Sequence, residues 1–126
     1  MRVGCLQVGG AFAILAAVGI YLAFPHPIYD QARLKAIGAE ALLLEPAHPV
    51  KPPAQWANIP KDQWTPAIAS VHPLWVTVYP GTVMITERVY FDDSWGYFIP
   101  RDGRKPANCS NDCWEVSQGV YWFHFG

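Results

Sequence analysis

Apolar residues dominate the first part of the chain, where Val3 to Phe24 form an almost unbroken run with Gln7 as its one strongly polar member. A helix rises about 1.5 Å per residue, so a run of this length matches the ~30 Å hydrocarbon core of a bilayer. We therefore expect residues 1–24 to form a transmembrane signal anchor that contacts the membrane through residues 3–24. Pro25 and Pro27 would end this helix, because proline cannot continue it.

The charges on either side of the apolar run predict an orientation. Arg2 precedes the run without a nearby acid, whereas the first charges after it, Asp30, Arg33 and Lys35, are mixed in sign. The positive-inside rule then favours a cytoplasmic N-terminus. The chain would be a single-pass membrane protein with residues 25–126 outside the cytoplasm, facing the periplasm in a bacterial inner membrane. A cleaved signal peptide is the alternative, although Tyr21 would occupy a cleavage position that prefers small residues.

A helical spacing of apolar residues follows between residues 30 and 45. Asp30 is a candidate N-cap, and Glu45-Pro46 is expected to end the helix. The apolar positions, three or four residues apart, are Ala32, Leu34, Ile37, Ala41, Leu42 and Leu44. The segment has few basic residues, which favours packing on the domain over an interfacial position on the membrane.

Prolines are frequent in the next segment, residues 46–62, which we expect to be an extended linker with polyproline II character. Trp56 and Trp64 would dock this linker onto the domain. A short helix is expected over Pro66 to Ser70, with proline at its first position. Residues 25–70 are thus predicted to be a helix plus a proline-rich linker, and residues 71–126 a small β-rich domain.

From Pro73 onward apolar and polar residues alternate, and β-branched and aromatic residues are common, which is typical of strands. The expected strands cover Leu74–Tyr79, Val83–Phe91, Trp95–Ile99, Cys113–Ser117 and Val120–Phe125. Short connections favour an antiparallel β-meander of about five strands, so the predicted fold class is α+β with the amphipathic helix on one face. We expect Trp75, Trp95 and Trp122 to lie mainly in the core.

Cysteine spacing predicts one disulfide. Cys109 and Cys113 are separated by three residues, which suits a bond across a tight turn in an oxidising compartment. Reduced thiols remain an alternative, and zinc would need two more ligands where only His124 is near. The triplet Asn108-Cys109-Ser110 also matches a glycosylation sequon. Cys5 precedes the apolar core, where it would be a small apolar residue, and its acylation remains open.

Charge and motif content exclude several classes of function. The net charge is −1 and only 15% of residues are charged, so there is no basic stripe for nucleic acid. Ser70 near His72 and Ser94 after Asp92-Asp93 lack the context of a catalytic triad, and the two aspartates are explained as turn residues. We expect no catalytic residue, no metal and no cofactor.

A few residues remain as candidates for an interaction surface. Glu87 shares the apolar side of its predicted strand, where a carboxyl group needs a partner or a ligand. Arg101, Arg104 and Lys105 form an exposed basic loop in a mildly acidic domain. His124 lies in the apolar terminal strand, where a structural role is the simpler interpretation.

These features predict a non-enzymatic, membrane-anchored envelope protein whose small extracytoplasmic domain mediates interactions with an unknown protein partner or with the envelope. Two alternatives stay open, a secreted inhibitor or immunity-type protein and a small envelope enzyme that uses Glu87, Asp92 or His124. A concave pocket that holds two of these three side chains would favour the enzyme.

Overall fold

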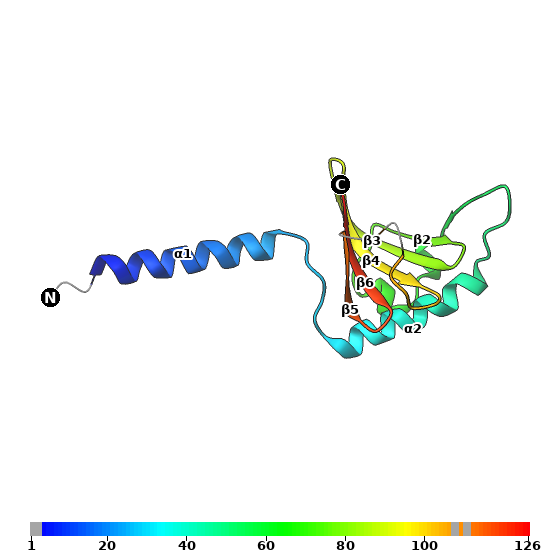
Figure 1. Cartoon of the computed structure of the whole chain (residues 1–126), viewed down its shortest axis with the longest axis horizontal. Coiled ribbons are helices and arrows are strands. Elements are labelled where there is room, and N and C mark those ends of the chain that lie inside the picture. The colour runs from blue at the N-terminus through cyan, green and yellow to red at the C-terminus, as the bar shows by residue number, and fades with distance from the viewer. Residues whose placement is uncertain (1–3, 107–108, 110–111) are drawn as a thin grey trace.

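A computed structural model describes residues 4–106, 109 and 112–126, with side chains in all of these except residues 4–9 and 21–23. Within this described part, three α-helices, one short 3-10 helix and a six-stranded antiparallel sheet form an α+β fold. The predicted α+β class with an antiparallel sheet is therefore confirmed. The first helix stands away from the sheet, while the second lies along one of its faces (Figure 1).

Helix α1 spans Gly4–Ala23 and ends before the prolines, as expected. Its described side chains are apolar and open to solvent, with Phe12 75% and Leu15 70% exposed. In the described residues, however, no helix is long and apolar enough to cross a membrane. The structure therefore does not support the predicted transmembrane helix.

Helix α2 spans Gln31–Ala47, and its N-cap is confirmed. The carboxylate of Asp30 accepts hydrogen bonds from the backbone N–H groups of Ala32 at 3.0 Å and Arg33 at 3.3 Å. The helix was expected to end at Glu45-Pro46, yet Pro46 lies inside its last turn. Proline removes only one donor there, and the N–H of His48 still reaches the carbonyl of Leu44 at 3.0 Å.

The strands run β1 (Ala57–Asn58), β2 (Trp75–Tyr79), β3 (Thr82–Tyr90), β4 (Asp93–Pro100), β5 (Cys113–Ser117) and β6 (Val120–Phe125). The proline-rich segment contributes β1, which makes one strand more than predicted. Strand β1 is followed by the 3-10 helix η1 (Lys61–Gln63) and the short helix α3 (Pro66–Ala69).

Strand order is β1-β2-β3-β4-β6-β5, so the sheet is not the simple meander that the sequence predicted. Residues 101–112 connect β4 to β5 and are long enough to carry the chain past one strand position. Strand β6 then returns between β4 and β5, where both of its edges are hydrogen-bonded. The most apolar strand thereby occupies a central position instead of an edge.

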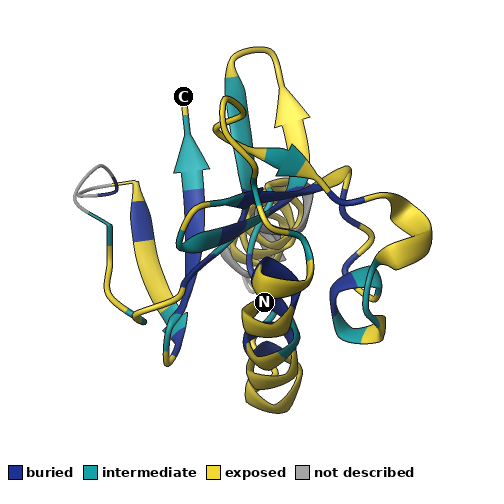
Figure 2. Cartoon of the chain, turned by 90° about the vertical axis from the view of Figure 1, so that its right-hand side faces the viewer, coloured by how far each residue is buried: buried dark blue, intermediate teal, exposed yellow. Residues whose placement is uncertain are grey.

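Each face of the sheet carries a cluster of buried side chains. On the inner face, the buried stripe of α2 packs against the middle strands, where Tyr97 and Trp122 are almost fully buried. On the outer face, Cys109 and Cys113 pack with Tyr121 and Phe123. Buried residues accordingly gather in the middle of the sheet, as Figure 2 shows.

The tryptophans follow the predicted distribution only in part. Trp122 is buried and Trp95 is half-buried against the inner cluster, but Trp75 is 42% exposed, so its assignment to the core was wrong. Trp75 is the first residue of β2 and pairs with Thr86 of β3 on one side, but β1 reaches only Val78 and Thr77, so no residue of β1 pairs with it on the other side. In the linker, Trp64 packs on the core while Trp56 is exposed.

Candidate functional site

A β-bulge in strand β3 creates the most irregular part of the sheet. Strands β3 and β4 pair in register up to Thr86 opposite Gly96, after which Arg88 faces Trp95 and Glu87 has no opposite residue. Such a bulge adds one residue to a strand and redirects the side chains around it. Here Glu87 and Arg88 both line the same cavity.

This cavity has a volume of about 320 Å³ and combines polar and aromatic side chains. Its walls come from the segment after α1, the loop after α3, strand β3 and strand β6, through Phe24, Pro25, His26, Val71, His72, Glu87, Arg88 and Trp122. His72 has a φ of 51°, in the left-handed region that side chains other than glycine adopt infrequently. Two backbone irregularities, the bulge and His72, therefore border one cavity.

Burial gives the carboxyl group of Glu87 unusual acid–base behaviour. Desolvation raises its pKa from 4.5 to about 7, against the opposing effect of the positive charges of Arg88 and Arg33. No hydrogen bond joins this carboxyl group to another described residue. Near neutral pH the group is thus present both as an acid that donates a hydrogen bond and as a carboxylate that accepts one.

Tyr97 lies next to this region on β4. Its hydroxyl oxygen accepts a hydrogen bond from the backbone N–H of Ile28 at 2.8 Å, which ties the segment before α2 to the sheet. Burial raises the pKa of the Tyr97 hydroxyl, and the nearby charge of Glu87 adds to the effect. Tyr97 therefore remains a neutral structural group at any physiological pH.

A second cavity of about 450 Å³ adjoins the first and is mainly apolar. It shares three lining residues with the first cavity and adds the end of the β3–β4 hairpin, and its walls are Phe24, Pro25, Arg88, Val89, Tyr90 and Trp95. The two cavities together define a groove between the segment after α1 and the sheet, with Arg88 at the junction. We call this the Glu87–Arg88 groove.

His124 takes a structural position beside the groove. Its ring stacks on Trp95 with centroids 4.6 Å apart, and its Nε2 lies 3.2 Å from a carboxylate oxygen of Asp93. Neither of the two cavities is lined by His124 or Asp92. The pairing of Glu87 with Asp92 or His124, which would have favoured an enzyme, is not found in the Glu87–Arg88 groove.

The basic loop is not a uniform patch. Arg101 is paired with Glu45, a buried carboxylate near the end of α2 that also accepts a hydrogen bond from the backbone N–H of Gly81 at 2.8 Å. Arg104 and Lys105 are exposed. Arg101 therefore anchors the loop to the helix, so the three basic residues are not equivalent.

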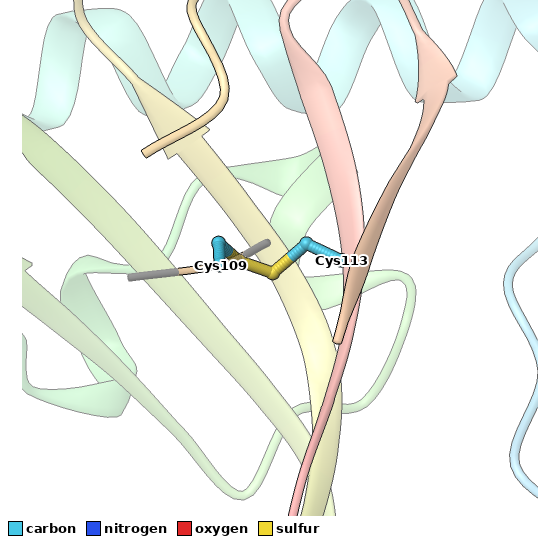
Figure 3. The surroundings of a disulfide bond; sticks show 2 residues. All are labelled: Cys109 and Cys113. Carbon is cyan, nitrogen blue, oxygen red and sulfur yellow. A yellow bond between two sulfur atoms is a disulfide. The ribbon is translucent and has the colours of Figure 1, made fainter. Parts of the chain in front are cut away.

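Cys109 and Cys113 lie at disulfide-bonding distance, as their spacing predicted, with Cα atoms 5.3 Å apart (Figure 3). Both cysteines are buried on the outer face of the sheet. The described part of the chain contains no group of three or more histidine, cysteine or acidic residues that could hold a metal ion. The side chain of Cys5, and Asn108 and Ser110 of the sequon, lie outside the described residues.

The histidines and Arg88 of the groove were not identified from the sequence. Strict alternation along a strand places Arg88 on the face opposite to Glu87, and His26 and His72 lie on separate segments. No local pattern links positions 26, 72 and 88. The one signal was Glu87, a carboxyl group on the apolar side of a predicted strand.

Comparison with known proteins adds no family assignment, because no protein-family model, curated protein or solved structure matches the chain.

Proposed function

We propose that the protein is a non-enzymatic binding protein held at a membrane by its N-terminal apolar segment, with the Glu87–Arg88 groove as its binding surface. The observation that carries the membrane part is the row of exposed apolar side chains on α1. Phe12, Ile14, Leu15, Val18 and Ile20 are all exposed, and neither hydrophobic cluster includes them. Such a large unpaired apolar surface is typical of a membrane or partner contact.

The binding part rests on the groove and its charges. A desolvated carboxyl group, an arginine and two histidines beside aromatic walls resemble a recognition surface more than a reaction centre. Neither cavity pairs Glu87 with Asp92 or His124, which argues against the enzyme alternative. The proposal places this groove outside the cytoplasm, next to the membrane to which α1 attaches.

Membrane attachment is tested by fractionating cells that produce the full chain. The wild type is expected in the membrane fraction, and the double substitution Leu15→Lys and Val18→Lys should release it, because lysine in an apolar segment is costly. The matched control is Leu42→Lys with Leu43→Lys, which places the same charges on two exposed leucines of α2. Wild-type protein in the soluble fraction, or equal behaviour of the two double variants, would refute attachment through α1.

Crossing and orientation need a separate measurement. A reporter that is active only outside the cytoplasm, fused after Gly126, is expected to be active, and the protein should resist alkaline extraction. An inactive reporter would contradict the proposed location. Extraction by alkali with an active reporter would show export and peripheral attachment without a spanning helix.

A further inference from the structure

The Glu87–Arg88 groove has two chemically different halves that meet at one residue. Around Glu87 the groove is polar, with His26 and His72 on the same cavity. Toward the β3–β4 hairpin it is apolar, lined by Val89, Tyr90 and Trp95. Arg88, Phe24 and Pro25 line both halves. A ligand that fills the groove must therefore combine a polar head with an apolar body.

We propose that the groove binds a small amphipathic carboxylate, a molecule with one carboxylate group and an apolar body. Cavities of about 320 and 450 Å³ lie within the size range of small-molecule sites. The carboxylate would lie between Arg88 and Glu87, and the apolar body against Trp95 and Tyr90. This assignment rests on the cavities and their lining, and it stands whether or not α1 attaches to a membrane.

The charges around Glu87 favour an anionic head over a cationic one. Arg88 lines the cavity, and Arg33 is close enough to act on the Glu87 carboxyl group, so one acid faces two permanent positive charges. An ammonium head would be repelled by both guanidinium groups. A carboxylate can accept a charge-assisted hydrogen bond from Arg88 and a second one from the protonated carboxyl group of Glu87.

Solvent exposure in the apolar half supports an apolar body. Tyr90 is 67% and Val89 is 43% exposed, and Trp95, which lines the same cavity, is half-buried. An apolar group lying against these side chains would remove their surface from water, which is favourable in proportion to the area covered. The ring of Trp95 stacks on His124 with centroids 4.6 Å apart, which helps to orient this wall of the groove.

Three small molecules that share a similar apolar part and differ in the charge of the head group test the head-group assignment. Phenylbutanoate, phenylbutanol and phenylbutylammonium are titrated into the full chain by calorimetry, in buffer if the protein is soluble and in lipid nanodiscs if it is not. Empty nanodiscs give the blank. The carboxylate should bind with one-to-one stoichiometry and at least tenfold more tightly than the other two probes. Equal binding of all three, or tighter binding of the ammonium, would overturn the proposal.

Arg88 and Glu87 are tested by substitution. Arg88→Ala should weaken phenylbutanoate binding about tenfold, the loss of one charge-assisted hydrogen bond. Arg104→Ala removes an exposed arginine from the distant loop and should leave affinity unchanged. Arg88 is exposed, so its variant should fold, which a thermal melt checks. Wild-type affinity in Arg88→Ala would refute the proposed head-group contact.

A pH series isolates the contribution of Glu87. Binding of the carboxylate requires the Glu87 proton, so affinity should be higher near pH 6 than near pH 8. The other ionisable side chains around Glu87 are His26, His72, Arg88, Arg33 and Tyr97. Glu87→Gln keeps a hydrogen-bond donor without titrating, so this variant should bind well at both pH values. Loss of binding in Glu87→Gln, or tighter wild-type binding at the higher pH, would overturn the assignment.

Discussion

Arg101→Ala tests whether Arg101 stabilises the fold through its ion pair with Glu45 or is only an exposed charge, as the sequence predicted. The sequence predicted Arg101, Arg104 and Lys105 to be equivalent exposed charges. The structure instead pairs Arg101 with Glu45, whose side chain is 8% exposed while that of Arg101 is 67% exposed. Removing Arg101 therefore leaves a buried carboxylate with one remaining partner, the N–H of Gly81 at 2.8 Å.

The expected cost follows from what Glu45 loses. Its carboxylate accepts hydrogen bonds from Nη2 of Arg101 and from Nε of Arg101 at 3.1 Å. Breaking a fully buried ion pair from one side costs about 3–5 kcal/mol. The Arg101 head is largely in water, which screens the pair, so we expect a smaller loss of about 1–3 kcal/mol in the free energy of unfolding.

Urea unfolding of the full chain measures this loss, since a pure change in stability shifts the midpoint and leaves the slope unchanged. Arg104→Ala is the control and should change stability by no more than about 0.5 kcal/mol. In a Glu45→Gln background the charge is gone, so Arg101→Ala should cost less than in the wild type, with a coupling of about 1–2 kcal/mol. If Arg101→Ala and Arg104→Ala have equal effects, or if the cycle shows no coupling, the pair does not stabilise the fold.

Three further outcomes are expected, each measured as the free energy of unfolding of the full chain. Trp122→Ala should cost about 3–5 kcal/mol, because this ring is buried and meets Tyr97 edge-on at 5.1 Å; near-normal stability would show that β6 is not part of the core. Gly96→Ala should cost about 1–3 kcal/mol, since a Cβ atom there would collide with the carbonyl of Ile85, whereas Gly10→Ala on α1 has open space and serves as control. The raised pKa of Glu87 means that the folded state holds its proton more tightly than the unfolded state, so stability should fall as pH rises from 4.5 to about 7 and then level off. After allowance for solvent screening the fall should be about 1–2 kcal/mol, and Glu87→Gln should abolish it; the same pH dependence in that variant would exclude Glu87 as its source.

The sequence alone predicted the features that depend only on residues close together in the chain. Turn residues on either side and aromatic or β-branched content predicted β5 over Cys113–Ser117 and β6 over Val120–Phe125, with the bounds that the structure has. The N-cap of α2 was predictable because an aspartate that bonds the first turn of a helix needs only its neighbours. The Cys109–Cys113 proximity likewise depends on a short loop and not on the rest of the fold.

Strand order and edges were decided by the tertiary structure. The alternation that predicts a strand is the same whether that strand lies at an edge or in the centre, so it gave no sign that β6 lies between β4 and β5. For the same reason Trp75 matched a core position in the sequence yet lies exposed at the start of β2. The two-residue strand β1 forms only because β2 offers it a hydrogen-bonding edge.

The Glu87–Arg88 groove depends most strongly on tertiary structure. Strict alternation placed Glu87 and Arg88 on opposite faces, but one unpaired residue at the bulge lets both reach the same cavity. His26 and His72 join them from segments that are distant in the chain, and Glu45 meets Arg101 across 56 positions. The sequence shows which residues are charged. It does not show which of these charges come close together in a low-dielectric space, because that depends on how the folded elements exclude water between them.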